Sequence, residues 1–504
     1  MASIKEIGAR IWAAIAERET QKWAAKPVET QEAVFHRLLH AAKDTAFGKD
    51  HGFADIQTHE EFKVRVPLRD YEGLRTYVDR VVDGESDVLW PGRPLYYAKT
   101  SGTTSGAKYI PLTKESVPYH IKSARNALFA HIRNTGRTGF LNGKMIFLQG
   151  SPELEDKKGV ALGRLSGITA HFVPSYLLKN RMPSWETNCI EDWETKVQAI
   201  AEETYTADMT VISGIPPWVQ MYFERLMEKT GKKTIAEIFP NFDLFVTGGV
   251  ALEPYRARLL ELFGKNVPIL ETYPASEGFF AYQDQAGSPD LLLLLNNEMF
   301  YEFVPADQFF EENPPRLSIG EVELGVNYAL ILNTNAGLWG YSIGDTVQFV
   351  SKAPYRIRVT GRIKHFISAF GEHVIGSEVE YAMDQALIQH GGLVREFTVA
   401  PNVNPSEGGL PYHEWLVEFD ELPADISAFS ATLDAALRRK NSYYDDLISG
   451  NILKPCVLRA LGPESFIQYM KSEGKLGGQN KVPRLTNDRK IAYALLALQA
   501  LAFV

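Results

Sequence analysis

A run of small hydroxylated and glycine residues, followed by a lysine, is the stretch of this sequence best suited to chemistry. Residues 99–111 read Lys-Thr-Ser-Gly-Thr-Thr-Ser-Gly-Ala-Lys-Tyr-Ile-Pro. Gly102 and Gly106 allow backbone angles at which consecutive N–H groups converge on one anion, and Lys108 would add a full positive charge. Further hydroxyl donors are Ser101, Thr103, Thr104 and Ser105.

This composition predicts a phosphate-binding loop, with a flexible connector as the alternative. The spacing does not match the Walker A pattern, because alanine and not lysine follows the second glycine. That mismatch argues against an ordinary P-loop NTPase. The apolar run at 95–98 predicts a strand end and residues 113–130 predict a helix, so we expect the loop to lie between regular elements.

Length, composition and charge limit the classes of protein that the chain can belong to. Its 504 residues predict two to four domains, and 45% hydrophobic with 23% charged residues is typical of a globular protein. A formal charge of −9 argues against a general nucleic-acid binder, although a local basic pocket remains possible. Cys189 and Cys456 have no metal-ligand spacing around them, so we expect neither a zinc site nor a disulfide framework. A reducing cytoplasm fits best.

The two ends of the sequence predict helices and not membrane segments. Residues 1–21 place charged residues among apolar ones, which is typical of an amphipathic helix and not of a signal peptide. Residues 491–504 are apolar but too short to span a bilayer. Other predicted helices lie before residue 53 and at 70–82, 218–227 and 254–263.

Short apolar runs that end in glycine-containing loops and lead into helices predict the central architecture. They lie at 145–148, 209–212, 244–247 and 267–271, the last leading into a predicted loop at 273–278. Repeated strand–loop–helix units predict a mostly parallel sheet covered by helices on both faces. Ligands of such sheets bind at the carboxyl ends of the strands.

From residue 291 onward strand follows strand, which predicts an antiparallel sheet or small barrel attached to the parallel one. These strands are expected at 291–295, 299–304, 320–326, 328–333 and 346–350. A capping box of Ser377 and Glu380 predicts the start of a helix. Strands at 397–400 and 415–419 then predict a small α+β domain at the end of the chain.

Four segments stand in an order that resembles the adenylate-forming enzymes. They are Thr-Ser-Gly-Thr-Thr-Ser-Gly at 100–106, Tyr-Pro-Ala-Ser-Glu-Gly at 273–278, Tyr-Ser-Ile-Gly-Asp at 341–345, and Gly361-Arg362. Within that superfamily the chain resembles the Gretchen Hagen family of acyl acid amido synthetases, in a bacterial-type version. That closer resemblance rests on 341–345, on 361–371 and on Gly-Gly-Gln-Asn-Lys-Val-Pro-Arg at 477–484, and it extends over essentially the whole chain.

The resemblance implies an α/β fold with a large N-terminal adenylate-forming domain, 1–361, and a smaller mobile C-terminal α+β domain, 362–504. It implies an enzyme that uses ATP and Mg²⁺ to convert a carboxylic acid to an acyl adenylate and then transfers the acyl group to the amine of an amino acid. The partners are then these small substrates, with no nucleic acid and no membrane, in a cytoplasmic monomer. The sequence leaves open which acid and which amine are used.

The resemblance also implies roles for residues of the large domain. The hydroxylated loop holds phosphates, and Glu277 carries Mg²⁺. Tyr273, near Ser276, offers an aromatic face to adenine, and Gly248-Gly249 lets the backbone approach the base. Asp345 accepts from the ribose hydroxyls, for which a carboxylate has suitable oxygens.

In the small domain, Arg362 is implied to act at a hinge near ribose or phosphate. Lys481 is implied to reach the α-phosphate and carboxylate oxygens. Where plant members carry a lysine this chain has His373, which leaves the charge of that segment open. Trp218 is a candidate for the acyl pocket, with core packing as the alternative. Two rival functions remain: an acyl-CoA ligase of the phenylacetate type, and a non-catalytic nucleotide-binding protein.

Overall fold

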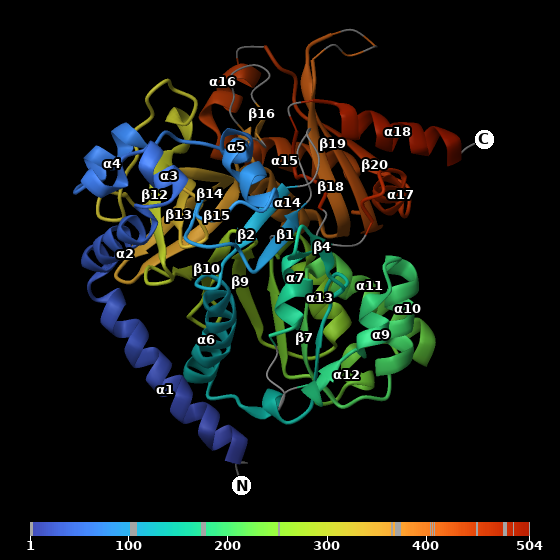
Figure 1. Ribbon diagram of the computed structural model, residues 1–504. Helices are drawn as coiled ribbons and strands as arrows, with labels where there is room; N and C mark the ends of the chain where they lie inside the picture. The colour runs from blue at the N-terminus through green and yellow to red at the C-terminus, as the bar shows by residue number, and fades with distance from the viewer. Residues whose placement is uncertain are drawn as a thin grey trace. The chain divides into compact units, whose positions relative to one another are not determined.

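The computed structural model describes most of the chain. The described residues are 4–100, 108–172, 178–249, 252–363, 366–367, 374–403, 405, 407, 409–449, 452–476, 481–486 and 488–502. The chain divides into two compact units (Figure 1). Unit 1 is Met1–Val250 with Leu262–Arg358, and unit 2 is Ala251–Glu261 with Val359–Val504. The predicted domain boundary at 361/362 stays a prediction.

Unit 1 is built on two sheets. The larger, of 11 strands, has the order β12-β13-β14-β15-β11-β10-β9-β8-β7-β3-β6, and the smaller has the order β2-β1-β5-β4. The larger sheet comprises β3 (Lys144–Phe147), β6 (Arg181–Met182), β7 (Met209–Ser213), β8 (Leu244–Gly248), β9 (Ile269–Ala275), β10 (Gly278–Gln283), β11 (Leu291–Leu293), β12 (Met299–Pro305), β13 (Asn327–Thr334), β14 (Tyr341–Lys352) and β15 (Tyr355–Arg362). The smaller comprises β1 (Tyr96–Thr100), β2 (Lys108–Leu112), β4 (Glu155–Lys157) and β5 (Val160–Gly163).

Helices surround these sheets. They are α1 (Ile4–Ala24), α2 (Pro27–Ala42), α3 (Ala46–Asp50), α4 (His59–Arg65), α5 (Tyr71–Val82), α6 (Val117–Thr135), α7 (Leu165–Ala170), α9 (Trp185–Cys189), α10 (Trp193–Thr204), α11 (Pro216–Thr230) and α12 (Ile235–Ile238). The next helix, α13 (Glu253–Phe263), belongs mostly to unit 2. Figure 1 shows α6 on one side of the parallel strands and α9–α12 on the other. Burial on both faces explains why these strands read as continuous apolar runs.

The predicted parallel core is confirmed, because β6, β3, β7, β8 and β9 pair in parallel in that order. The predicted antiparallel strands are attached to the parallel core, since they continue the same sheet beyond β9. The strand predicted at 320–326 is wrong. Leu324 makes only an isolated bridge with Phe349, and Gly325 has a φ of +79°, which ends any extended run.

Two further predictions about local structure are corrected. The segment predicted as a loop at 273–278 is a tight hairpin in which β9 pairs with β10 and Gly278 lies opposite Ala275. A second strand, β2, also stands between the predicted phosphate loop and helix α6. Antiparallel pairing of Thr100 with Lys108 therefore joins the two ends of loop 101–107.

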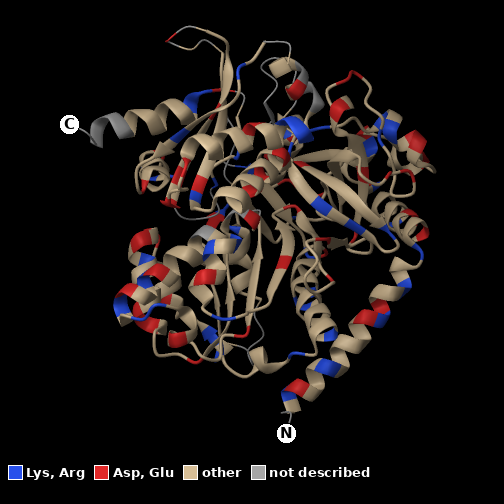
Figure 2. Ribbon diagram, turned by 180° about the vertical axis from the view of Figure 1, so that it is seen from behind, with Lys and Arg blue, Asp and Glu red and all other residues tan. Residues whose placement is uncertain are grey.

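Helix α1 packs along α6 through polar contacts as well as through the buried Ala13. Arg10 donates to the Gly136 carbonyl at 2.7 Å, and Arg133 pairs with Glu17 at 2.7 Å. Figure 2 shows acidic and basic residues mixed along α1. In the described part of the chain, no helix is both long and apolar enough to cross a membrane.

Unit 2 has a three-stranded sheet in the order β18-β19-β20, with β18 antiparallel and β20 parallel to β19. Its elements are β16 (Phe366–Ile367), β17 (Val374–Ile375), α14 (Gly376–His390), β18 (Leu393–Asn402), β19 (Tyr412–Glu421), α15 (Ile426–Lys440), α16 (Ser442–Ser449), β20 (Val457–Leu461), α17 (Ser465–Ser472) and α18 (Lys490–Ala502). The predicted Ser377–Glu380 capping box is wrong, because Glu378 accepts from the Ile375 N–H at 3.0 Å. The expected α+β composition is present.

Candidate functional site

Irregular pairing of β14 with β13 determines where Asp345 lies. On β13, Ala329 pairs with Thr346 of β14, and Ile331 pairs with Ser342 of β14. The two β13 residues are two positions apart, whereas their partners on β14 are four positions apart. Strand β14 therefore bulges between Ser342 and Thr346, and Gly344 within the bulge has a φ of +87°. Such bulges redirect side chains and occur often beside functional sites.

Tyr273 on β9 meets this bulge. Its hydroxyl donates to Asp345 Oδ2 at 2.7 Å, and its ring packs edge-on to Phe280 with the centroids 4.9 Å apart. The residue is 6% exposed, so most of the ring is in the core. In the sheet order three strands separate β9 from β14, so this contact requires a strongly curved sheet.

A second tyrosine binds the tip of the hairpin. Tyr341, at the start of β14, donates to Glu277 Oε1 at 3.3 Å. Glu277 and the buried Ser276 form the turn between β9 and β10. The structure thus brings together Tyr273, Glu277 and Asp345 from two of the four motif segments. Sequence reasoning gave Tyr341 no role, although it opens one of the quoted motifs.

The Gly248-Gly249 pair ends strand β8 beside β9. A Cβ atom at Gly248 would lie 2.3 Å from the carbonyl oxygen of Thr272, so no larger residue fits without moving the backbone. Gly249 has a φ of +79°, which favours glycine. The buried Thr247 hydroxyl just before this pair has no hydrogen-bond partner within the described residues.

The predicted phosphate loop is only partly described. Ser101, Gly102, Thr103, Thr104 and Ser105 lie outside the described residues. Lys108 is described, and its Nζ lies 5.5 Å from the centroid of the Tyr71 ring. The Tyr71 hydroxyl accepts from the Tyr109 N–H at 2.9 Å, so α5 holds the strand that leaves the loop.

Trp218 lies in the core at the start of α11. It is 6% exposed, and its ring centroid lies 4.4 Å from that of Trp193 on α10. Packing between two helices accounts for this position, and the acyl-pocket role stays a prediction.

A short segment beside β18 positions Lys481 in unit 2. The Val399 N–H donates to the Arg484 carbonyl at 2.9 Å, and the Thr486 N–H donates to the Val399 carbonyl at 2.9 Å. Lys481 is exposed three residues before Arg484, and Arg362 is exposed at the end of β15. His373 lies outside the described residues.

Arg484 anchors that segment through a buried network. Its guanidinium pairs with Glu396, lies 3.4 Å from Glu380 and donates to the Tyr255 hydroxyl at 3.3 Å. Tyr255 lies on the part of α13 that belongs to unit 2, and its own hydroxyl donates to Glu396 at 2.7 Å. The anchor therefore joins α13, α14 and β18.

Asp384 lies on α14 near this network. Burial raises the pKa of its carboxyl to about 7, and Glu253 and Glu380 add to the shift while Arg256 opposes it. Among the described residues no arginine or lysine forms an ion pair with Asp384, so its proton is the main compensation for burial.

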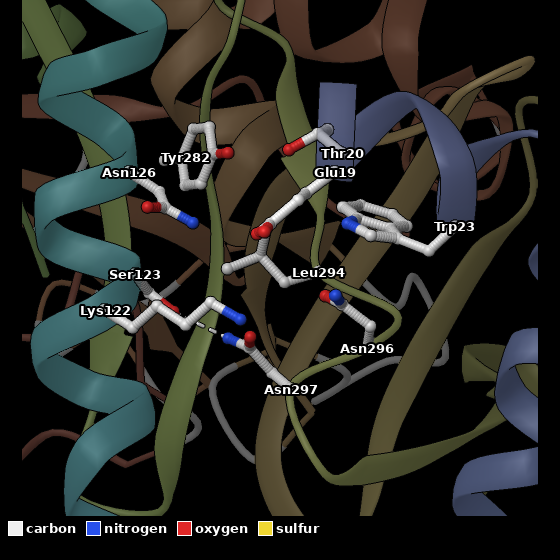
Figure 3. A pocket seen from close by; sticks show the side chains of 10 residues that line it. All are labelled: Glu19, Thr20, Trp23, Lys122, Ser123, Asn126, Tyr282, Leu294, Asn296 and Asn297. Carbon is white, nitrogen blue, oxygen red and sulfur yellow. Dashed lines mark hydrogen bonds between the residues drawn. The ribbon is translucent and has the colours of Figure 1, made fainter. Parts of the chain in front are cut away.

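A small cavity in unit 1 lies apart from these residues, between α1, α6 and β10 (Figure 3). Asn297 donates to the Ser123 hydroxyl at 2.7 Å at its edge, while Asn126 Oδ1 has no partner among the described residues. Its volume of about 10 Å³ leaves room for one water molecule. It is therefore too small for an organic acid.

Three models of one family match the chain. The GH3 family N-terminal domain matches residues 16–190, the central domain matches 292–362, and the C-terminal domain matches 377–490. Indole-3-acetic acid-amido synthetase GH3.3 of Arabidopsis thaliana is 21% identical, over 90% of this chain and 88% of that protein. Jasmonoyl–L-amino acid synthetase JAR4 of Nicotiana attenuata is 22% identical, over 63% of this chain and 66% of that protein.

Solved structures share the fold. The GH3.15 acyl acid amido synthetase superposes with a TM-score of 0.78 at 15% identity, covering 96% of both chains. A 2-hydroxyisobutyryl-CoA ligase superposes with a TM-score of 0.61 at 13% identity, covering 95% of this chain and 93% of that one. At these identities the likeness concerns the fold alone.

Proposed function

The chain belongs to the GH3 family, and from this we propose that it activates a carboxylic acid with ATP and transfers the acyl group to the amine of an amino acid. A carboxylate oxygen attacks the α-phosphorus of ATP, and pyrophosphate leaves. The amine nitrogen then attacks the acyl carbon, and AMP leaves. Adenylation is needed because a carboxylate by itself is a poor electrophile.

The observation that carries this proposal is that two tyrosine hydroxyls join the segments 273–278 and 341–345: Tyr273 donates to Asp345, and Tyr341 donates to Glu277. The two segments lie far apart in the sequence, and chance packing would not require two motif segments to be joined by two hydrogen bonds. Asp345 accepts from the ribose hydroxyls, and the Tyr273 hydroxyl holds its carboxylate. Tyr273 also offers an aromatic face to adenine, and Gly248-Gly249 lets the backbone come close to the base.

Two anions must approach each other in the first step, so the site has to supply positive potential. We assign that task to the donors of loop 101–107, including Ser101, Thr103 and Thr104, and to Lys108. Well-placed donors of this kind each contribute about a hundred- to a thousandfold in rate. Pairing of Thr100 with Lys108 holds both ends of the loop together.

Glu277 suits a magnesium ion that is bound together with the triphosphate. No group of three or more His, Cys, Asp or Glu side chains that could hold a metal is found among the described residues. Mg²⁺ at nucleotide sites needs only one or two carboxylates besides waters and phosphates, so a single glutamate fits. When bound, the ion neutralises phosphate charge. Tyr341 orients the Glu277 carboxylate through its hydroxyl.

Unit 2 supplies the remaining charge. Lys481 reaches the α-phosphate and the attacking carboxylate during adenylation, and its position depends on the segment anchored by Arg484. Arg362 acts near ribose or phosphate at the hinge of a mobile C-terminal domain, 362–504. These roles follow from the family pattern and from the exposure of both side chains.

A screen for ATP–pyrophosphate exchange tests the first half-reaction. Aromatic, indolic, aliphatic and oxylipin acids are each supplied with ATP and Mg²⁺, without an amine. The acid that supports exchange is then incubated with each amino acid, and AMP and the N-acyl amino acid are measured. Exchange without any acid dependence, or AMP formation that requires coenzyme A, contradicts the proposal.

An acyl-CoA ligase of the phenylacetate type is the second candidate, because such enzymes share the hydroxylated loop and the Tyr-x-x-Ser-Glu pattern of residues 273–277. The same assay separates the two functions, because only a ligase of that type forms an acyl thioester when coenzyme A replaces the amino acid. A nucleotide-binding protein without chemistry would bind ATP and give no exchange with any acid.

A further inference from the structure

The end of β5 places an arginine beside the strand that leads into the predicted phosphate loop. Strands β1 and β5 pair in parallel, with Ala98 opposite Gly163. Strand β1 ends at Thr100, and Arg164 is the first residue beyond β5. Arg164 therefore lies at the same edge of the small sheet as the entrance to loop 101–107.

The guanidinium of Arg164 is half-buried and has no acceptor among the residues that the structure describes. Within the described residues it makes no hydrogen bond and no ion pair. Burial lowers the pKa of Arg164, and among the described residues the exposed Glu191 alone opposes that shift. Since guanidinium groups in partly buried positions are normally paired, this one has donors to spare.

A hydroxyl group lies beside it. A Cβ atom placed on Gly150 would be 2.8 Å from Arg164 Cδ, so the glycine leaves space for the arginine side chain. The same point is 3.7 Å from Arg164 Nε and 3.8 Å from Ser166 Oγ, so both groups border the space that Gly150 leaves open. The Ser166 hydroxyl is buried and also has no partner among the described residues.

Two other cations near this position already have acceptors. Arg181 donates to the Ala170 carbonyl at 3.0 Å. It also donates to the Gln149 side-chain oxygen at 2.6 Å when the Gln149 amide is oriented so that both of its ends have partners. The buried Lys196 donates to the Asn188 carbonyl, and burial lowers its pKa to about 8. They contribute positive potential and fix the local backbone. Of these three described cations, Arg164 is the one without an acceptor and can bind a ligand.

We propose that Arg164, with Ser166 beside it, binds the carboxylate of a substrate at the edge of the nucleotide site. This inference rests on the proposed function, which brings two carboxylates to the enzyme: the acid to be activated and the amino acid that accepts the acyl group. A guanidinium matches a carboxylate with two parallel hydrogen bonds. The triphosphate has its own donors in loop 101–107.

Kinetics of Arg164→Gln and Arg164→Lys test the proposal and identify the carboxylate. The KM values of the acid, the amino acid and ATP are measured separately, the acid in pyrophosphate exchange. We expect the KM of the acid or of the amino acid to rise about 10- to 100-fold in Arg164→Gln, because a hydrogen-bonded charge pair is lost, and less in Arg164→Lys. The ATP KM stays unchanged. The matched control is Arg225→Gln on α11, which loses only a surface pair with Glu228.

A rise in the acid KM assigns the site to the acid, and a rise in the amino acid KM assigns it to the acceptor. Unchanged KM values for both, or a rise confined to ATP, overturn the proposal. Circular dichroism and melting temperature show whether each variant is folded.

A labelling experiment tests the site without turnover. Phenylglyoxal modifies accessible guanidinium groups, and peptide mapping reports modification of Arg164. Benzoate, indole-3-acetate and L-aspartate serve as carboxylate probes, and their neutral amides serve as controls. Protection by a carboxylate and not by its amide supports the site even if no acid supports pyrophosphate exchange, in which case only the proposed function fails. Equal modification with and without every probe overturns the site.

Discussion

Replacing Tyr273 by phenylalanine removes one hydroxyl group and leaves the ring in place. That hydroxyl lies 2.7 Å from Asp345 Oδ2, and the tyrosine is 6% exposed, so water cannot readily replace it. A hydrogen bond to a charged group contributes about 1.5–3 kcal/mol, and about 1.4 kcal/mol corresponds to a factor of ten in an equilibrium constant. Part of this free energy is lost from the folded state itself. We therefore expect Tyr273→Phe to bind ATP about tenfold more weakly and to melt at a lower temperature.

The assay is calorimetric titration with ATP and Mg²⁺, followed by pyrophosphate exchange at saturating acid. Tyr301→Phe is the matched control, because its hydroxyl donates to the Leu294 carbonyl at 3.3 Å in the same sheet and not to a predicted site residue. Tyr273→Leu removes the ring as well, so any additional loss of affinity reports the contact with adenine.

One pattern of results would refute the reasoning. If Tyr273→Phe binds ATP as tightly as Tyr301→Phe while Asp345→Asn loses affinity, the tyrosine hydroxyl does not position the carboxylate. If Asp345→Asn also keeps full affinity, the ribose role of Asp345 is wrong.

Three further changes give distinct outcomes. Lys481→Ala is expected to slow pyrophosphate exchange at least about a hundredfold and to leave ATP binding nearly unchanged, because the ammonium acts mainly in the transition state. Gly248→Ala is expected to destabilise the fold by about 1–3 kcal/mol in thermal melts, because its Cβ would meet the Thr272 carbonyl oxygen at 2.3 Å. The pKa of Asp384 is raised to about 7, so its contribution to stability is full below about pH 4 and is lost as the pH rises through about 7. Asp384→Asn should therefore be more stable than the native protein at pH ~8 and not at pH ~4, as measured by hydrogen exchange in α14.

Each of these has a control and a contrary result. Equal losses of exchange and of ATP affinity would remove Lys481 from the catalytic residues. Gly8→Ala on α1, where nothing lies within 4 Å of the new methyl group, should melt no lower than the native protein, and a Gly248→Ala melt no lower than that of the native protein contradicts the steric argument. An identical pH dependence in Asp384→Asn and the native protein would show that another group titrates.

The parallel strands β3, β7, β8 and β9 and several helices, such as α5, α6 and α11, could be predicted from the sequence because their signals are local. Apolar runs such as 209–212, bounded by turn residues, have few alternatives once helical patterns flank them. The hairpin at 273–278 was predicted as a loop because the segment contains turn-forming residues. Only the pairing of β9 with β10 keeps the backbone extended on both sides of the turn. The false strand at 320–326 shows the converse, since Gly325 with its positive φ outweighs local β propensity.

The residue types of the candidate site were determined by the sequence alone: a loop of hydroxyls and glycines, and the tyrosines, carboxylates and lysine of the motif segments. Only the tertiary structure decided that the Tyr273 hydroxyl meets Asp345, that Tyr341 holds Glu277 and that Arg164 stands beside β1. These contacts depend on strand register and on a bulge in β14, where a shift of one position turns each side chain to the opposite face of the sheet. Register is set by the packing of segments far apart in the chain, and no local pattern of residues records it.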